Sequence, residues 1–518
     1  MAQLVARPST SLYDRLAKNL PSSNTFTFHH ISTPPTKCDP LYAALPGAKP
    51  ERTYCESHFL TVSAPRNARL VLLFAIEVLI FTTKRLTTVF VSKADSTGCL
   101  ASLKITAGGS ASIVRTIAAE FVSWLVKHRQ RPRTRLVLSL FARAQGQYLF
   151  PASADNKGKH VLDDRQLVKW WCKTLDPVMR QSDAALTTQA YVIVLGFDRQ
   201  ETTAFFPPSH RSDPPDARKW VFGHPLEKIA IHPTAPPRCL VPRFPDDPKA
   251  RFLDELDEEI PDATGPRLLS SPSKKGSGMW KSIKTLSQFW EMMAFRQECS
   301  SGRLVGFIWV VFTPNDGETQ EDEETENAVF SPASPSPGAA RLPPVVDDVT
   351  KERIKKPLSG PIVPRLPRVK RMSSSVVSSS IPEHSPFWKW PESSRGQVVV
   401  DSPTYDRIHD LLLRLDFQND DAATESTVKW FEEAAKIAGN EAAWGREVVG
   451  TATVTTAPDN GHTNGTAKPT TASAPNDLSA SIVRKKRKAE AAPESVVQET
   501  IQPVNMLSSG LVRRKPKP

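Results

Sequence analysis

Two adjacent carboxylates, Asp246 and Asp247, stand in the segment FPDDPKARF at residues 244–252. A carboxylate beside a lysine amine can accept its proton, and removing that proton at pH 7 costs roughly 4–5 kcal/mol for an ordinary lysine. An isolated aspartate is a weak base, but burial or a second carboxylate increases its affinity for a proton. The two residues are therefore candidates for acid–base chemistry, although Pro-Asp-Asp-Pro also suits a turn with solvated charges.

Aromatic residues form a second group of candidates. Tyr148 offers a ring and a hydroxyl, and it also suits a buried tyrosine whose hydroxyl is bonded to the protein. Trp170 and Trp171 are neighbours in a predicted helix, about 100° apart around its axis, so they cannot share one face. One of them can line a cofactor channel and the other a lysine tunnel, whereas two core tryptophans are the alternative. Phe141 ends a predicted strand and, taken alone, is typical of a core residue.

A third group could bind phosphate. The residues directly before the predicted helix at 113–127 are Gly108, Gly109, Ser110, Ala111 and Ser112. Free amides at a helix N-terminus, with glycines that permit close approach, favour a pyrophosphate. A plain helix cap is the alternative. Lys157, Lys159 and His160 precede another predicted helix, where cations can meet phosphates or simply face solvent.

Several common motifs are absent from the sequence. It contains no G-x-x-x-x-G-K-[ST], G-x-G-x-x-G, H-E-x-x-H or G-x-S-x-G pattern. Arg143 and Gly146 begin the Q/R-x-x-G-x-G/A pattern of the small acetyltransferases, but Tyr148 occupies its last position. The six cysteines are scattered without a C-x-x-C pair, which argues against structural zinc and against a disulfide framework. We expect no metal and a reducing compartment.

Three segments have an unusual composition and a characteristic order. They are VSKADSTG (91–98), QYLFPASADNKGKHVLDDRQLVKWW (147–171) and FPDDPKARF (244–252). Together they resemble the fungal histone H3 lysine acetyltransferases known as regulators of Ty transposition. The resemblance extends over residues 11–313 and resumes over 387–450.

The resemblance implies an α/β (α+β) catalytic domain with a central mixed sheet flanked by helices, similar in fold to the CBP-type acetyltransferases. It implies a histone lysine N-acetyltransferase in which a lysine of histone H3 attacks acetyl-CoA directly. No cysteine lies in the three segments, which agrees with transfer without a covalent enzyme intermediate. The resemblance further implies that histone chaperones present the histone H3–H4 pair. It also implies roles in chromatin assembly, transcription regulation and the DNA damage response.

The resemblance also assigns roles to individual residues. It implies that the chemistry depends on Asp247, Asp246, Trp171 and Tyr148, and that Lys249 is buried and self-acetylated. It implies that acetyl-CoA is bound by Ala94, Asp95, Ser96, Gly108, Gly109, Ser110, Ala111, Ser112, Phe141, His160, Val161, Leu162 and Trp170. Taken alone, Asp95 suits a turn in which it caps its own backbone. Arg251 could pair with Asp246 or Asp247.

Hydrophobic periodicity predicts the elements that position these residues. The predicted helices are 11–21, 113–127, 164–175 with Asp163 and Gln166 as a capping box, 280–296, 405–417 and 427–438. The predicted strands are 70–81, 86–92, 136–141, 191–195 and 304–312, with a loop at 92–98. Glu77 interrupts the apolar run 70–81, which is shorter than the about 20 residues that span a bilayer.

Composition divides the chain into four parts. We predict a first part of the catalytic domain at 1–313, a disordered acidic-to-basic insertion at 314–386, C-terminal helices of the domain at 387–450 and a disordered basic tail at 451–518. The net charge is +12, and the tail carries RKKRK at 484–488 and RRKPK at 513–517. These clusters suit nuclear import and contact with DNA. No secretory signal or membrane segment is expected, so the predicted location is the nucleus.

Two other functions fit the sequence. The chain could be a non-catalytic chromatin scaffold whose tail and insertion bind nucleic acid. It could also be an acyltransferase that modifies another protein or a small amine, because substrate choice depends on surfaces that no motif reports. Acetyl transfer by a chain ending near residue 450 would distinguish an enzyme from a scaffold.

Overall fold

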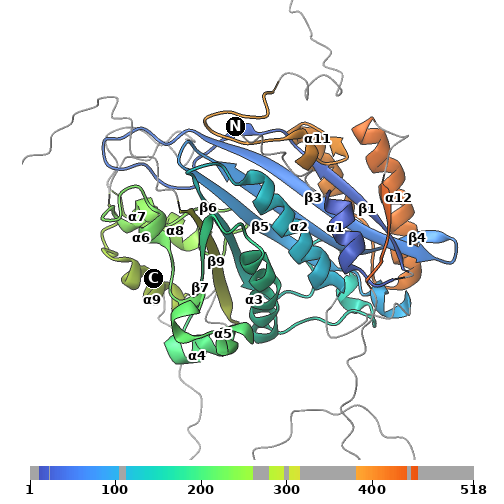
Figure 1. Ribbon diagram of the computed structural model, residues 1–518, viewed down its shortest axis with the longest axis horizontal. Helices are drawn as coiled ribbons and strands as arrows, with labels where there is room; N and C mark the ends of the chain where they lie inside the picture. The colour runs from blue at the N-terminus through green and yellow to red at the C-terminus, as the bar shows by residue number, and fades with distance from the viewer. Residues whose placement is uncertain are drawn as a thin grey trace, which may run out of the picture. The chain divides into compact units, whose positions relative to one another are not determined.

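The computed structural model describes residues 11–22, 24–103, 113–260, 279–296, 303–315, 381–439 and 445–452 (Figure 1). Within these residues one 11-stranded sheet has the order β10-β1-β3-β4-β5-β6-β9-β7-β8, with β11 paired to β1 and β2 paired to β3. The strands are β1 (Thr25–Ser32), β2 (Thr36–Cys38), β3 (Thr53–Arg66), β4 (Arg69–Thr82), β5 (Leu86–Ser96), β6 (Arg135–Arg143), β7 (Leu186–Val194), β8 (Trp220–Phe222), β9 (Val305–Pro314), β10 (Val398–Val399) and β11 (Arg446–Val449).

The sheet is mixed, as predicted. Strands β1, β3, β4 and β5 are antiparallel neighbours, and β9 runs antiparallel to both β6 and β7. The pairs β5–β6, β7–β8 and β1–β10 are parallel. The predicted loop at 92–98 is wrong in part, because β5 continues to Ser96 after a register shift opposite the Glu77/Val78 step.

Helices cover both faces of the sheet. On β1, His30 contacts Phe121 and Trp124 of α2, whereas its neighbour His29 stacks on Phe431 of α12 at 4.1 Å between ring centroids. Successive side chains of a strand point to opposite faces, so α2 and α12 lie on opposite sides. The helices that accompany α2 are α1 (Leu12–Asn19) and α3 (Asp164–Arg180), with α2 itself at Ile113–Arg129 (Figure 1).

The second face carries two groups of helices. One group is α11 (Ser402–Leu412) and α12 (Asp420–Ala438), drawn in orange in Figure 1. The other packs against the odd-numbered residues of β6 and β9 and contains α6 (Leu226–Ile229), α8 (Ala250–Glu258) and α9 (Leu286–Ala294). The remaining short helices are α4 (Arg199–Thr203), α5 (Ser209–Ser212), α7 (Pro237–Leu240), η1 (Cys99–Leu103), η2 (Ser153–Asp155), η3 (Pro215–Ala217) and η5 (Glu392–Ser394).

Capping side chains fix where several of the helices begin. Ser11 opens α1, and Asp163 and Gln166 form the predicted capping box of α3. Three predicted helices have different bounds. The capping box of Thr285 and Gln288 makes α9 begin later than residue 280, Asp401 starts α11 before residue 405, and Asn419 starts α12 before residue 427. No helix among the described residues is long and apolar enough to cross a membrane.

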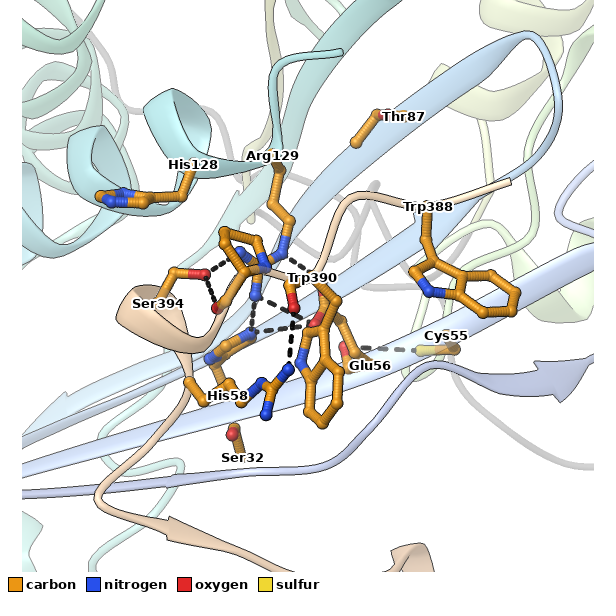
Figure 2. A network of polar contacts seen from close by, with 12 residues as sticks. Ser32, Cys55, Glu56, His58, Thr87, His128, Arg129, Trp388, Trp390 and Ser394 are labelled. Atoms are coloured by element: carbon orange, nitrogen blue, oxygen red, sulfur yellow. Dashed lines mark hydrogen bonds and ion pairs between the residues drawn. The ribbon is translucent and has the colours of Figure 1, made fainter. Parts of the chain in front are cut away.

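A buried polar network joins the segment at 381–400 to the rest of the domain (Figure 2). Arg129, at the end of α2, donates to Glu56 with Nε and with Nη2, the latter at 3.0 Å, and to the hydroxyl of Ser394. Its Nη2 also lies 3.2 Å from Nε2 of His58, whose Nδ1 is 3.0 Å from His30. Burial lowers the pKa of both histidines, so the two rings are neutral near pH 7. The positive charge of Arg129 therefore offsets the desolvation cost of burying the carboxylate of Glu56.

Candidate active site

The carboxylate of Asp95 holds the QYLFP segment at the end of β5. Its Oδ2 accepts the backbone N–H groups of Tyr148, Leu149 and Phe150 at 2.7, 3.0 and 3.3 Å. Its Oδ1 accepts the ammonium of Lys159 and the N–H of Ser96, both at 2.8 Å. The prediction that Asp95 caps a turn of its own backbone is therefore too narrow, because most of its bonds reach residues more than fifty positions away.

Lys159 is a structural cation in this arrangement. Its side chain is 5% exposed and bonds Asp95 and the hydroxyl of Ser153 at 2.7 Å, so it neither faces solvent nor is directed at a phosphate. The loop before α3 lies against the end of β5, since a Cβ added to Gly98 would meet the backbone N of Lys159 at 2.6 Å. Gly98 has φ +92°, which also favours glycine.

The residues on both sides of Lys159 are more open. Lys157 and His160 are exposed, Val161 is 42% exposed and Leu162 is half-buried. An apolar side chain that is open to solvent near the ammonium of Lys157 is compatible with a bound ligand that has an apolar arm and negative groups. The roles of His160, Val161 and Leu162 in binding acetyl-CoA stay predictions.

Two positions before Asp95 on β5, Lys93 reaches the FPDDPKARF segment. Its Nζ lies 2.8 Å from Oδ2 of Asp246. Because residues i and i+2 of a strand point to the same face, Lys93 and Asp95 are directed to one side of the sheet. The three segments singled out in the sequence thus meet at the end of β5. Sequence reasoning missed Lys93, although its spacing from Asp95 in VSKADSTG was a usable signal.

Asp247 and Lys249 form a buried ion pair. The ammonium of Lys249 lies 2.8 and 2.6 Å from the two carboxylate oxygens, and the side chains are 0% and 3% exposed for Asp247 and Lys249. Asp247 also accepts the backbone N–H groups of Lys249 at 2.9 Å and of Phe244 at 3.3 Å. Each carboxylate oxygen therefore accepts one backbone N–H and contacts the ammonium. The predicted burial of Lys249 is confirmed.

Two aromatic rings lie beside the Lys249 ammonium. Its Nζ lies 5.0 Å from the ring centroid of Phe307 and 5.9 Å from that of Phe244. A narrow hollow adjoins it, lined by Ser139, Leu140, Phe141, Leu226, Pro242, Phe244, Lys249, Trp290, Phe307 and Trp309. Burial lowers the pKa of Lys249, although the carboxylate of Asp247 opposes the shift. Deprotonating Lys249 to the neutral, nucleophilic amine therefore costs less free energy than deprotonating a surface lysine.

Asp246 has the opposite character. Its side chain is 67% exposed, and its backbone has φ +53°, a left-handed conformation that is uncommon for a residue with a Cβ. The cations beside the two aspartates are Lys93 and Lys249, whereas Arg251 lies 3.6 Å from Glu255. The turn thus presents one carboxylate to solvent and encloses the other.

The remaining predicted residues lie on both faces of the sheet. Phe141 packs beside Phe90 at 5.6 Å, on the face that carries Lys249. Leu140 and Ala142, which flank Phe141 on β6, belong to the same buried cluster as Trp171. The ring of Trp170 packs edge-on against that of Trp171, with 4.8 Å between the ring centroids. Phe141 and the two tryptophans therefore belong to different faces.

The hydroxyl of Tyr148 donates to the backbone oxygen of Arg143, so the alternative of a satisfied hydroxyl describes this structure. Burial raises the pKa of Tyr148, which keeps the hydroxyl protonated. Its catalytic role stays a prediction, and a bound substrate would have to compete with this bond. Ala94 is half-buried against the core and Ser96 is half-buried at the end of β5.

Some predicted contacts fall outside the described residues. These are Gly108, Gly109, Ser110, Ala111 and Ser112. Across the part of the chain that is described, no three His, Cys, Asp or Glu side chains are placed to hold a metal ion.

Comparison with known proteins decides the family. The profile of the "Histone acetyltransferase KAT11-type domain" matches residues 12–135 and 131–433. The chain belongs to the KAT11-type histone acetyltransferases. It is an enzyme that acetylates histone lysine, and acetyl-CoA is the co-substrate that this family implies.

Individual relatives agree with this assignment. The acetyltransferase is 39% identical to the histone acetyltransferase rtt109 of Aspergillus flavus over 94% of its own length and 90% of that protein. It is 29% identical to rtt109 of Schizosaccharomyces pombe over 57% of its length and 70% of the relative. The crystal structure of Rtt109 from Aspergillus fumigatus matches with a TM-score of 0.66 and 40% identity, covering 86% of this chain and 100% of that one.

Replacing Phe141 or Trp170 with alanine should weaken acetyl-CoA binding by this acetyltransferase at least about 10-fold, because a buried aromatic ring contributes roughly 1.5–3 kcal/mol. Isothermal titration calorimetry measures the effect. Phe222→Ala, which removes a ring that is 40% exposed on β8, is the matched control.

Circular dichroism must first show that each variant is folded, because loss of a core tryptophan alone can cost about 3–5 kcal/mol. Normal binding by a folded Trp170→Ala protein would assign that residue to the core and remove it from the binding site.

Proposed function

We propose that this acetyltransferase modifies a lysine of histone H3 within an H3–H4 pair that a histone chaperone presents, and that the FPDDPKARF turn is the reacting centre. The observation that supports this most is the Asp247–Lys249 pair, an amine and a carboxylate 2.6 Å apart beside the rings of Phe307 and Phe244. Ionisable groups whose pKa is shifted by burial and by a specific charged partner are enriched at functional sites.

Lys249 would be the first acceptor. Its Nζ forms a bond to the carbonyl carbon of the acetyl group, the carbon–sulfur bond breaks, and coenzyme A leaves as the thiol. Asp247 accepts one proton from the Lys249 ammonium and releases it to solvent, and a second proton of the amine goes to the departing sulfur, so that the amide keeps one N–H. The apolar hollow lined by Phe141 and Phe307 could accommodate the acetyl methyl group.

Acetylation would then change what Asp247 can do. An amide carries no positive charge, so the carboxylate loses its ion-pair partner while it stays buried. A buried carboxylate without a neighbouring cation binds a proton more tightly and is a stronger base. In this state Asp247 can accept a proton from the histone lysine, while the exposed Asp246 can attract its ammonium. Transfer is direct, and we expect it to need no metal.

The experiment is incubation of the purified protein with isotope-labelled acetyl-CoA and an H3–H4–chaperone complex, followed by mass spectrometry. We expect label on an H3 lysine and on Lys249, with no loss of rate in a metal chelator. H3 labelling at the wild-type rate by a folded Asp247→Asn protein would exclude this turn as the reacting centre. Equal rates with and without the chaperone would exclude chaperone dependence.

We also propose a nuclear location, with the basic clusters at 484–488 and 513–517 acting in import and in contact with DNA. Deleting residues 453–518 should leave acetylation in vitro largely intact and should reduce nuclear accumulation in imaged cells. The deletion begins at 453 because Thr451 and Ala452 donate backbone N–H groups to Ala17 and Leu20 at 2.8 and 2.9 Å.

The insertion at 314–386 also contains a basic stretch at 355–371, which could compensate for the tail, so it is removed in a second variant. A double deletion that stays fully nuclear in cells lacking the partner chaperone would refute the targeting role. Loss of acetylation by the folded tail deletion would show instead that the tail binds substrate or chaperone.

A further inference from the structure

Glu77 is a carboxylate inside an apolar strand that the chemistry described above does not use. It is 6% exposed and lies in β4 between Ile76 and Val78, which are fully buried. A carboxylate in such a place is costly unless its charge and its lone pairs find partners. The partners of Glu77 therefore indicate why it is there.

Two of these partners come from α11. The hydroxyl of Tyr405 donates to Oε1 of Glu77 at 2.9 Å, and Nε2 of His409 lies 3.8 Å from the same oxygen. Burial raises the pKa of Tyr405, so its hydroxyl stays a donor. Burial lowers the pKa of His409, so its ring is neutral near pH 7 and does not balance the charge of Glu77.

The balancing cation is Lys93. It lies opposite Glu77 in the β4–β5 register, and its Nζ is 3.7 Å from Oε2 of Glu77. The same Nζ lies 2.8 Å from Asp246. Burial alone would lower the pKa of Lys93, but the two carboxylates outweigh it and the net shift is upward. Lys93 is therefore a permanent cation between the strand and the turn.

The turn needs such a contact. Asp246 has φ +53°, and a strained backbone of this kind persists only where the surroundings hold it. Because Asp247 follows directly, any relaxation of Asp246 also moves the buried carboxylate. The salt bridge from Lys93 is a contact from the sheet that opposes this relaxation.

We infer that Tyr405, Glu77 and Lys93 form a positioning chain that holds Asp246, and through it Asp247, in the geometry that the reaction requires. The inference deepens the proposed function and rests on it, since it assumes that the turn carries the chemistry. It makes α11, which follows residues 314–386 in sequence, a working part of the active site.

The test compares kcat and KM for acetyl-CoA in Lys93→Met, Lys93→Arg and Tyr405→Phe. Lys93→Met should lower kcat about 10- to 100-fold, as expected for a small misplacement of a reacting group, with KM for acetyl-CoA within a factor of about two. Lys93→Arg keeps the cation and should restore most of the rate. Tyr405→Phe removes one hydroxyl and should lower kcat less. Arg15→Met, which breaks a partly buried 2.7 Å ion pair with Glu120 away from the turn, should leave kcat unchanged.

A double variant separates positioning from general damage. If Lys93 acts through Asp246, the Lys93→Met/Asp246→Asn protein should turn over no more slowly than the slower single variant. Multiplying effects, or normal kcat in folded Lys93→Met and Tyr405→Phe, would overturn the chain. If Lys93→Met does not fold, normal kcat in Tyr405→Phe alone overturns it. Normal turnover in Asp247→Asn would instead overturn the proposed function, which is a different outcome.

Discussion

Replacing Asp247 with asparagine should reduce kcat of histone acetylation by about 100-fold or more, the range typical of a lost general base, with little change in the affinity for acetyl-CoA. The variant keeps the shape of the side chain but cannot accept the proton of the attacking amine. Asp246→Asn should have a smaller or similar effect, because that carboxylate is exposed and contacts solvent. Single-turnover kinetics with H3–H4 and chaperone separate chemistry from binding.

The single variant also leaves the buried ammonium of Lys249 without its partner, which can cost roughly 3–5 kcal/mol. A matched pair of proteins removes this complication. Lys249→Gln carries a neutral amide in place of the amine, and Lys249→Gln/Asp247→Asn differs from it only in the carboxylate. We expect kcat of the double variant to be about 100-fold lower than that of Lys249→Gln. Equal rates in this pair would show that Asp247 stabilises the turn and handles no proton.

Replacing Asp95 with asparagine should lower the free energy of unfolding by about 3–5 kcal/mol, the usual result of breaking a buried ion pair. One carboxylate holds three consecutive backbone N–H groups and the ammonium of Lys159. Asparagine offers a single oxygen and no charge, so part of this set stays unpaired. Urea unfolding, with the midpoint and slope both measured, reports the loss.

Asp155→Asn is the control, because that carboxylate is exposed in η2 of the same region. Its free energy of unfolding should stay within about 0.5 kcal/mol of the wild type. Acetyl-CoA binding should weaken in Asp95→Asn, since the ends of β5 and of the loop before α3 are held by this carboxylate. A change of stability below about 1 kcal/mol would mean that solvent replaces these bonds.

The sequence alone predicted the strands whose apolar runs are continuous. These strands include β4, β5, β6 and β9. The capped helix α3 was predicted as well. Strands β1 and β3 were not predicted, because His29, His30, Glu56 and His58 interrupt their apolar pattern. Their partners lie on distant elements, such as Arg129 on α2 and Ser394 in η5, and periodicity reports only local neighbours.

The candidate site was predicted as three segments, and the structure brings them together. The sequence could not show which charged residues in these segments pair with each other and which of them are buried. Asp95 and Lys159 have the residue types of a ligand site, yet their charges neutralise each other. Asp246 and Asp247 are adjacent and chemically identical, but the turn exposes one and buries the other. Both differences come from tertiary contacts.

The position of strand β1 in the sheet has a consequence for how the protein folds during synthesis. Strand β1 is the first strand that the structure describes, but its neighbours β10 and β11 are the last. During synthesis on the ribosome, one edge of β1 therefore stays open until residues 398–449 have been added. The hydroxyl of Ser394 likewise reaches Arg129 only late. An open edge strand is prone to wrong pairing, so the nascent protein should depend on folding factors until its final strands are released.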